Sequence, residues 1–292
     1  MASQAEIEYH YDINTDFFAA FLDTKYRVYS CGVWKRAATL EEAQQDKLDR
    51  ICRFAGVTRR HRVLDVGCGW GGLMRRAVER FSAASAHGLT LSCDQFRYLR
   101  EQSFPRTTVE LRGWSETQFP AGAFDAIASI GAFEHFASRQ DRAAGRQRAV
   151  YRRFFEWCSD VSAPDAAVGL QTIVTARQPA QLSEVRDTRF LLQEVFPGSA
   201  LPTISDIQAA VQDLYEISDA RRIGGDYART LAEWRQRLER EQRWLRERFG
   251  DRLVEHYRSY FMAAERSFQS GVVDLVQLSL RKVRPARQVL AA

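Results

Sequence analysis

Short apolar segments alternate with amphipathic segments through the middle of the chain. The apolar segments have the length of strands, whereas apolar residues recur about every three to four positions in the segments between them, as they do in helices. The pattern predicts strands at residues 62–66, 85–89, 108–112, 124–130 and 168–174, and helices at 39–56, 71–81, 93–102 and 139–157. Strands that alternate with helices indicate an α/β fold with a doubly wound, largely parallel sheet, which binds ligands at the carboxyl ends of its strands.

The regular alternation stops after Val174. Prolines and a glycine in residues 175–203 predict an irregular insertion or lid there. The sequence then predicts a helix at 205–211, a strand at 215–221, one or two long helices over 228–269 broken near Gly250, and a closing strand at 272–283. At the other end, Tyr9 to Val33 is rich in aromatic residues, which predicts either a hydrophobic cover or a lid whose ring faces stabilise a cation.

We interpret the chain as one domain over residues 1–292. Its parts are an N-terminal helical cover (1–55), a cofactor-binding core (56–174), a substrate-side insertion or lid (175–230), and the long helices with the closing strand (231–292).

Composition narrows the possible partners and sites. Arginines alternate with acids in stretches such as 235–248, which is typical of a solvated helix face, so the net charge of +5 does not predict nucleic-acid binding. No apolar stretch approaches the roughly 18 residues of a membrane span, and the acidic N-terminus does not look like a secretory signal. We therefore expect a cytoplasmic protein. Its five scattered cysteines predict neither a disulfide framework nor a metal site.

A glycine loop follows the first predicted strand of the core, in the sequence Val63-Leu64-Asp65-Val66-Gly67-Cys68-Gly69-Trp70-Gly71. Glycines there let the backbone approach a ligand where a Cβ would clash. Their spacing differs from the G-x-G-x-x-G of dinucleotide-binding loops, which disfavours an NAD-dependent oxidoreductase. Asp65 would repel a pyrophosphate, but it would attract a sulfonium and an amino group. The loop therefore predicts a methyltransferase that uses S-adenosylmethionine, and a glycine turn without a ligand is the structural alternative.

Further segments resemble the cyclopropane-fatty-acid-synthase-like methyltransferases over nearly the whole chain. Such a resemblance implies a Rossmann-like class I methyltransferase sheet with N-terminal and inserted helical cover. The segments are Tyr11-Asp12 with Asp16-Phe17-Phe18, Tyr29-Ser30-Cys31-Gly32, Leu40-Glu41-Glu42-Ala43-Gln44, 65–71, Gly88-Leu89-Thr90-Leu91-Ser92 with Gln95, 131–136, Phe196-Pro197-Gly198 with Leu201-Pro202, and Tyr227-Ala228-Arg229-Thr230-Leu231.

The resemblance also implies which residues bind S-adenosylmethionine. They are Asp65, Gly67 and Gly69 at its methionine part, Thr90 and Gln95 near the ribose, Trp114 and Ile130 on either side of the adenine, Tyr29 and Ser30 closing over it, and also Leu91.

The family's chemistry adds a methyl group to an alkene, and loss of a proton then closes a cyclopropane. The resemblance implies a bicarbonate base held by a cysteine, a glutamate, a histidine and a tyrosine. Cys31, Glu134 and Tyr227 match three of these, but Gln171 stands where the histidine is expected. An amide supplies no positive charge, so anion affinity should fall. Each of the four also has a structural alternative, from a buried thiol to a carboxylate that starts a helix. We expect His135 to cap or pack.

The altered bicarbonate set leads us to expect methyl transfer to an alkene carbon or an amine nitrogen of a small specialised metabolite. Two alternatives stay open: a cyclopropane synthase or methyltransferase that acts on unsaturated lipid acyl chains, and a non-catalytic protein that keeps the cofactor fold for binding. We expect a small-molecule substrate and no integral membrane segment. The sequence leaves open whether the chain forms a homo-oligomer.

Overall fold

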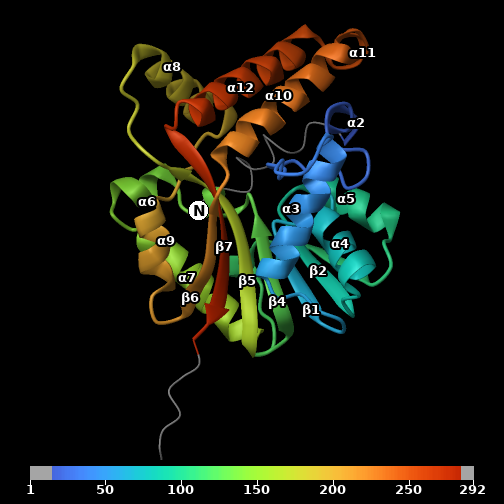
Figure 1. The fold of residues 1–292 in the computed structure, drawn as a ribbon, viewed down its shortest axis with the longest axis vertical. Helices are drawn as coiled ribbons and strands as arrows, with labels where there is room; N and C mark the ends of the chain where they lie inside the picture. The colour runs from blue at the N-terminus through green and yellow to red at the C-terminus, as the bar shows by residue number, and fades with distance from the viewer. Residues whose placement is uncertain (1–14, 284–292) are drawn as a thin grey trace, which may run out of the picture.

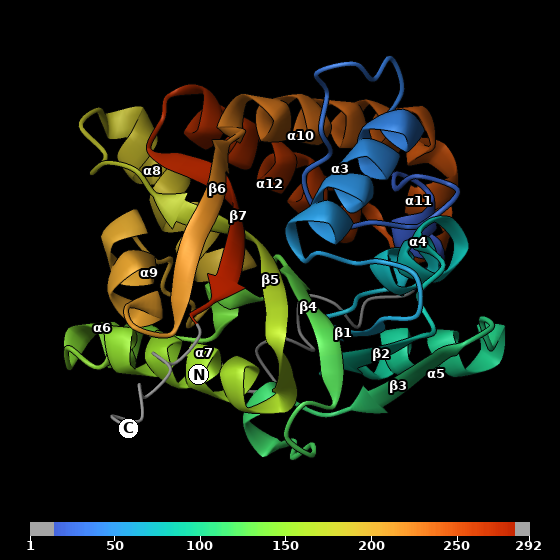
Figure 2. The ribbon, with the colours of Figure 1, turned by 60° about the horizontal axis from the view of Figure 1, so that its bottom comes forward.

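A seven-stranded sheet forms the centre of the molecule, in the order β3-β2-β1-β4-β5-β7-β6. The computed structural model describes residues 15–283, so Tyr9, Tyr11 and the acidic N-terminus lie outside it. All strands from β3 to β5 pair in parallel, whereas β7 is antiparallel to both β5 and β6 (Figures 1 and 2). The strands are β1 (Arg62–Val66), β2 (Ser85–Thr90), β3 (Thr107–Leu111), β4 (Phe124–Ile130), β5 (Ser162–Thr175), β6 (Tyr215–Arg222) and β7 (Val273–Lys282).

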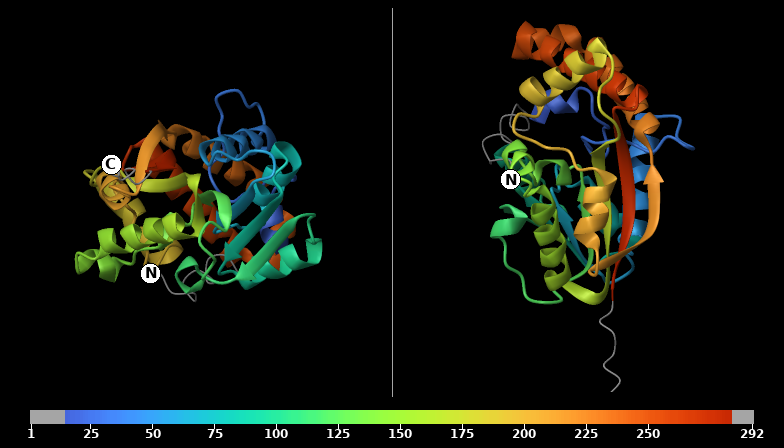
Figure 3. Two further views of the ribbon diagram at one scale, coloured as in Figure 1. Left: turned by 90° about the horizontal axis from the view of Figure 1, so that it is seen from below. Right: turned by 90° about the vertical axis from the view of Figure 1, so that its left-hand side faces the viewer.

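Helices cover both faces of the sheet, because successive side chains of a strand point to opposite faces. On β1, Val63 packs in one apolar cluster with the first set of helices, and Leu64 packs in another cluster with the second set. Figure 3 gives two further views of these layers. The first set comprises α3 (Leu40–Phe54), α4 (Gly72–Phe81) and α5 (Cys93–Gln102), and the second comprises α7 (Gln147–Val161) and α9 (Ile204–Val211). The predicted doubly wound α/β fold is thereby confirmed.

Helix α3 begins as the sequence predicts, and it approaches the sheet closely. The Thr39 side chain accepts a hydrogen bond from the backbone N–H of Glu42, whose carboxylate accepts one from Thr39 in return. At the contact with β5, a Cβ on Gly169 would lie 2.7 Å from the carbonyl oxygen of Ile51. Glycine at this position therefore lets α3 lie directly against the centre of the sheet.

A third apolar cluster lies beyond the carboxyl ends of the parallel strands, where Figure 1 shows α10 and α12 crossing above the start of β7. The N-terminal aromatic residues Phe17, Phe18 and Phe21 are almost fully buried in this cluster, so this part of the predicted cover is confirmed. The elements of this layer are α2 (Thr15–Ala19), α8 (Leu182–Phe190), α10 (Gly224–Arg240), α11 (Gln242–Phe249) and α12 (Asp251–Gln269).

Three sequence-based boundaries are wrong. The long helix expected at 139–157 is two helices, α6 (Arg139–Ala143) and α7, because Gly145 between them adopts a left-handed φ of 68°. The stretch expected over 228–269 breaks at Glu241 as well as at Gly250. Residues 175–203 are not irregular throughout, since they contain α8 and a π-helical turn, Leu191–Val195. Their prolines fall outside these two elements.

Replacing Phe155 by alanine tests the apolar cluster between the sheet and helices α7 and α9. Phe155 is fully buried against Phe154, Phe133 and Tyr215, so Phe155→Ala should lower the free energy of unfolding by about 3–5 kcal/mol through lost apolar contact and a residual cavity. The measurement is chemical denaturation followed by circular dichroism. The control is Leu182→Ala, whose side chain is 83% exposed and whose loss should change stability by less than about 0.5 kcal/mol. Equal effects of the two variants would contradict this assignment of the core.

Candidate active site

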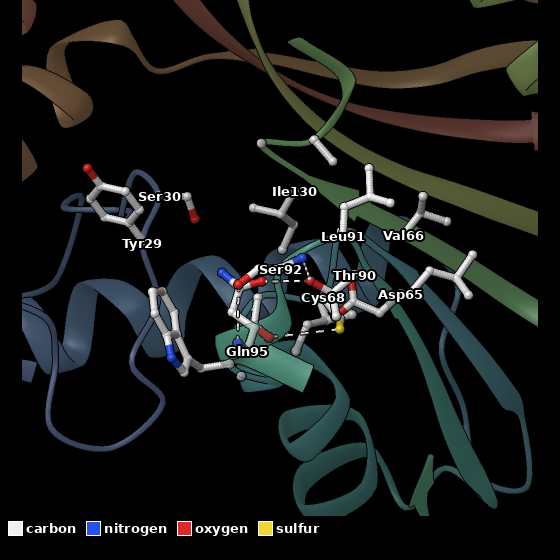
Figure 4. A pocket seen from close by; sticks show the side chains of 18 of the residues that line it. Tyr29, Ser30, Asp65, Val66, Cys68, Thr90, Leu91, Ser92, Gln95 and Ile130 are labelled. Atoms are coloured by element: carbon white, nitrogen blue, oxygen red, sulfur yellow. Dashed lines mark hydrogen bonds between the residues drawn. The ribbon is translucent and has the colours of Figure 1, made fainter. Parts of the chain in front are cut away.

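A pocket opens at the carboxyl ends of β1, β2 and β4, beneath the N-terminal cover. Figure 4 shows Tyr29 and Ser30 on one side of it and Thr90, Leu91 and Asp65 together on the other. All ten residues that the resemblance assigns to the cofactor line this single pocket: Tyr29, Ser30, Asp65, Gly67, Gly69, Thr90, Leu91, Gln95, Trp114 and Ile130. The fold thus brings together, from five separate segments of the chain, one concave surface of the size and lining expected of a nucleoside site.

The glycine loop needs glycine at Gly67 for two reasons. Its φ of 80° lies in the left-handed region, and a Cβ there would lie only 2.4 Å from the Cβ of Ala132. The backbone N–H groups of Gly67 and Cys68 both donate to the carbonyl of Leu89, which fastens the loop to the end of β2. The loop is therefore fixed in a conformation that leaves its outer surface open to the pocket.

Asp65 is a buried carboxylate at the end of β1. Burial raises its pKa to about 7, and the nearby ammonium of Lys47 acts in the opposite direction. Lys47 is itself fully buried on α3, and its Nζ donates a hydrogen bond of 2.7 Å to the hydroxyl of Ser30. A carboxylate in this position can pair with a positively charged group of a ligand.

The wall formed by β2 and α5 is held by side-chain hydrogen bonds. The Thr90 hydroxyl donates to Oε1 of Gln95 at 2.8 Å, and Ser92 caps α5 by accepting from the Gln95 backbone N–H. Trp114 forms the far wall on a short 3₁₀ turn, where its ring packs against Phe136. Trp114 is almost fully buried, and its Nε1 has no hydrogen-bond partner among residues 15–283. An N–H donor without a partner at a pocket wall fits a ligand that accepts a hydrogen bond.

A second pocket adjoins the first and is mostly apolar. Tyr29, Ser30, Gly131 and His135 line both pockets, so the two share a wall. Its further lining combines aliphatic and aromatic side chains from β5, the π-helical turn, α10 and α12, among them Ile173, Leu191, Leu192, Phe196, Leu201, Leu231, Tyr260, Phe268 and Val273, together with Glu134 and Tyr227. A pocket of this kind suits a hydrocarbon acceptor placed beside a cofactor.

Glu134 is the acid of the second pocket, on the turn that follows β4. Its Oε1 accepts a 2.7 Å hydrogen bond from the backbone N–H of Ile173, whereas its buried Oε2 has no hydrogen-bond partner among the described residues. Burial raises the pKa of Glu134 to about 7, against the effect of the Ile173 hydrogen bond. Such a carboxyl exchanges protons readily near neutral pH.

The four residues assigned to bicarbonate do not come together around one cavity. Glu134 and Tyr227 line the second pocket, but Cys31 and Gln171 line neither pocket. The Cys31 thiol donates to the carbonyl of Gly32 at 3.0 Å. Oε1 of Gln171 accepts a 2.7 Å hydrogen bond from Gln277 on β7, and Gln277 accepts in turn from Arg50. Gln171 therefore belongs to a buried polar chain between the sheet and α3.

Sequence reasoning missed two residues of the site. His135 was expected only to cap or pack, but it lines both pockets, and its Nδ1 lies 2.9 Å from the Ser199 hydroxyl. Burial lowers the pKa of His135 to about 4, so the imidazole is neutral. Lys47 is the second residue, and no motif in the sequence predicts a role for it. The one signal in the sequence is its position on the apolar face of the amphipathic pattern of residues 39–56.

Residues 15–283 contain neither a candidate metal site nor a membrane-spanning helix. No group of three or more His, Cys, Asp or Glu side chains is placed to hold a metal ion. Within the same range, no helix is long and apolar enough to cross a membrane. All five cysteines are free thiols.

Comparison with known proteins shows the family. A family profile described as "Mycolic acid cyclopropane synthetase" matches residues 1–278. Cyclopropane mycolic acid synthase 2 of Mycobacterium leprae is 33% identical over 294 residues, covering 94% of this chain and 93% of that protein. The structure of the cyclopropane synthase MmaA2 from Mycobacterium tuberculosis superposes with a TM-score of 0.87 at 30% identity, covering 97% of this chain and 99% of the other.

A second solved structure contains the demethylated cofactor. The mycolic acid cyclopropane synthase CmaA1, in complex with SAH and CTAB, superposes with a TM-score of 0.86 at 30% identity and covers 96% of this chain and 98% of its own. The class I methyltransferase fold implied by the resemblance is thereby confirmed. The chain belongs to the mycolic acid cyclopropane synthetase family of enzymes, and its cofactor is S-adenosylmethionine.

Proposed function

We propose that this enzyme methylates an alkene carbon of an unsaturated lipid acyl chain and that Glu134 then removes the proton whose loss closes a cyclopropane ring. The observation that carries the proposal is the apolar pocket that shares a wall with the cofactor pocket and contains one buried carboxylate with an unpartnered oxygen among the described residues. The relatives support the same chemistry, since they are named for cyclopropanation of mycolic acids.

This proposal adopts the lipid alternative from the sequence analysis in place of the small specialised metabolite. The preference for a small metabolite rested on Gln171, but Gln171 lines neither pocket and is hydrogen-bonded to Gln277. Its identity therefore says little about the acceptor. An amine acceptor would need polar groups to orient it, whereas the second pocket is lined mostly by hydrocarbon. Membership of an enzyme family argues against the non-catalytic alternative.

The residues of the first pocket fit S-adenosylmethionine, which supplies the electrophilic methyl group when bound. Asp65 would attract its positively charged groups, while the loop at Gly67 and Gly69 lets the backbone approach it. Tyr29 and Ser30 would cover the site and exclude water. By holding the two reactants in adjoining pockets, the protein converts an encounter in solution into a reaction between fixed neighbours.

The proposed reaction balances without a further reactant. The alkene's electron pair forms a bond to the methyl carbon as the carbon–sulfur bond breaks, which leaves a positive charge on the second alkene carbon. The Glu134 carboxylate then accepts a proton from the new methyl group, and the released electron pair closes the ring. The aromatic rings of Tyr29, Tyr227 and Tyr260 line the cavity and would stabilise the transient cation.

The bicarbonate base that the resemblance implies does not fit this chain. Cys31 and Gln171 lie outside both pockets, and the Gln171 amide oxygen already accepts from Gln277. Glu134 and Tyr227 alone would hold the anion, without a positive charge among the four assigned groups. We therefore assign the proton transfer to Glu134 itself.

Alanine substitutions at two left-handed glycines test the cofactor pocket. Gly67→Ala should weaken S-adenosylhomocysteine binding by roughly tenfold or more, because the new Cβ would lie 2.4 Å from Ala132 and displace the loop. Gly122→Ala is the matched control: its φ of 70° imposes similar backbone strain, but no atom lies within 4 Å of the added Cβ. Isothermal titration calorimetry measures both. If the two variants bind equally well, the loop at Gly67 does not contact the cofactor.

Product analysis tests the acceptor. Incubation with methyl-labelled S-adenosylmethionine and vesicles of unsaturated phospholipid should give acyl chains that gain one CH2 unit and lose their double bond, as mass spectrometry and proton NMR would detect. Vesicles of saturated phospholipid are the control and should take up no label. Label found only on a free amine or small alkene offered in parallel would overturn the lipid assignment.

Glu134→Gln tests the base. The amide keeps the shape but cannot accept the proton, so kcat at saturating cofactor should fall by roughly 10²–10⁴-fold while S-adenosylhomocysteine affinity changes little. Glu101→Gln, an exposed acid on α5, is the control. Because the ionised form is required and burial raises the pKa of Glu134 to about 7, kcat of the unmodified enzyme should fall tenfold per pH unit below that value. A flat profile between pH 5 and 8, as for an ordinary glutamate near 4.3, would remove Glu134 from this role.

A further inference from the structure

Lys47 is a fully buried lysine on α3 that the cofactor assignment does not use. Lysines are almost never fully buried unless they are paired. Its ammonium donates to the Ser30 hydroxyl at 2.7 Å, and the side chain has no exposed surface. Ser30 lines both pockets, so Lys47 touches the wall that separates cofactor from acceptor without lining either pocket itself.

Two buried carboxylates from different parts of the chain act on the ammonium electrostatically. Asp65 comes from the end of β1, and Asp23 comes from the N-terminal cover. Burial lowers the pKa of Lys47 to about 7, and the charges of Asp23 and Asp65 oppose that effect. A charge this deeply buried costs several kcal/mol unless opposite charges compensate it. The opposite charges of the three groups therefore reduce the cost of burying each one.

Asp23 in turn fixes the segment that leads to the pocket. Its Oδ2 accepts from the backbone N–H of Tyr26 at 2.6 Å, and its Oδ1 accepts from that of Val28 at 2.7 Å. These bonds hold the turn immediately before Tyr29 and Ser30. Lys47 thus fastens the cover to α3 through Ser30, while Asp23 holds the turn that precedes Tyr29 and Ser30.

We propose that Lys47 is a positioning residue for S-adenosylmethionine, which holds the Tyr29–Ser30 segment against the core so that the cofactor pocket is preformed. The role concerns the cofactor and does not depend on the identity of the acceptor. Loss of the ammonium leaves the Ser30 hydroxyl without its donor.

Lys47→Met tests the proposal, because methionine fills a similar volume without the charge. The KM for S-adenosylmethionine and the Kd for S-adenosylhomocysteine should each rise at least tenfold, while kcat at saturating cofactor stays within threefold. Lys35→Met is the matched control, since Lys35 is an exposed lysine of the same cover, and both constants should be unchanged. Calorimetry with S-adenosylhomocysteine needs no acceptor, so a wrong acceptor assignment would not affect this result.

Ser30→Ala separates positioning from a merely structural role. It removes the hydroxyl that accepts from Lys47 but leaves all three buried charges in place, so Kd should rise by a smaller factor than in Lys47→Met. In the double variant, the Kd should rise by less than the product of the two single-variant factors, because both substitutions remove the same contact. A Lys47→Met protein with a lowered melting temperature but a Kd and KM within twofold of the unmodified enzyme would overturn the proposal. If the Kd of the double variant rises by the product of the two single-variant factors, the Lys47–Ser30 contact does not position the cofactor. This conclusion holds even if the variants are less stable than the unmodified enzyme.

Discussion

Parallel pairing of β1, β4 and β5 is the constraint on which the site depends. Because parallel strands run in the same direction, their carboxyl ends meet at one edge of the sheet. The register pairs Asp65 with Ala128 and Ile130 with Gln171, and the N–H of Gly131 continues the ladder to the Gln171 carbonyl at 3.0 Å. The backbone hydrogen bonds thus place the glycine loop after β1 beside the turn after β4 that carries Glu134. Both pockets therefore lie at this edge of the sheet.

Burial of carboxyl groups distinguishes that edge of the sheet. The aromatic and apolar cover excludes water from Asp65 and Glu134, and burial raises both carboxyl pKa values to about 7. The protein gains no stability by burying these acids, since each ion loses its hydration. Groups of this kind, held in a cleft and displaced from their ordinary titration range, are typical of active sites. The surrounding ion pairs, such as Arg237 with Glu41, lie nearer the surface and serve the packing of the cover.

The sequence predicted the sheet well, because strands follow local patterns, and the ten residues that the resemblance assigns to the cofactor line one pocket. Apolar runs of strand length located six of the strands within one or two residues, and the start of β5 was missed because Ser162 to Ala166 is short of apolar side chains and precedes a shift in register. Gly145 broke a helix that amphipathic spacing alone had joined. A glycine within a helical pattern is tolerated in some helices and ends others, and the choice depends on tertiary packing.

Site residues were harder to predict where the direction of a side chain decided the outcome. Cys31 and Gln171 occupy family positions, yet their side chains meet Gly32 and Gln277 instead of a pocket, which no single-chain pattern reveals. His135 and Lys47 were missed for the opposite reason. Each is an isolated polar residue whose surroundings come from remote parts of the chain, namely Ser199 for the histidine and Ser30 with two acids for the lysine.

The place of β7 in the sheet also determines when this molecule can assemble. β7 follows every other strand in the chain but lies between β5 and β6. During synthesis β6 therefore emerges from the ribosome with no strand to pair with, and β5 keeps an open edge until residues 273–282 have been made. Unpaired strand edges of this kind are where nascent chains aggregate or bind chaperones. The five strands β3-β2-β1-β4-β5 can pair while translation continues, but β6 and the open edge of β5 gain their partner only once β7 has been made.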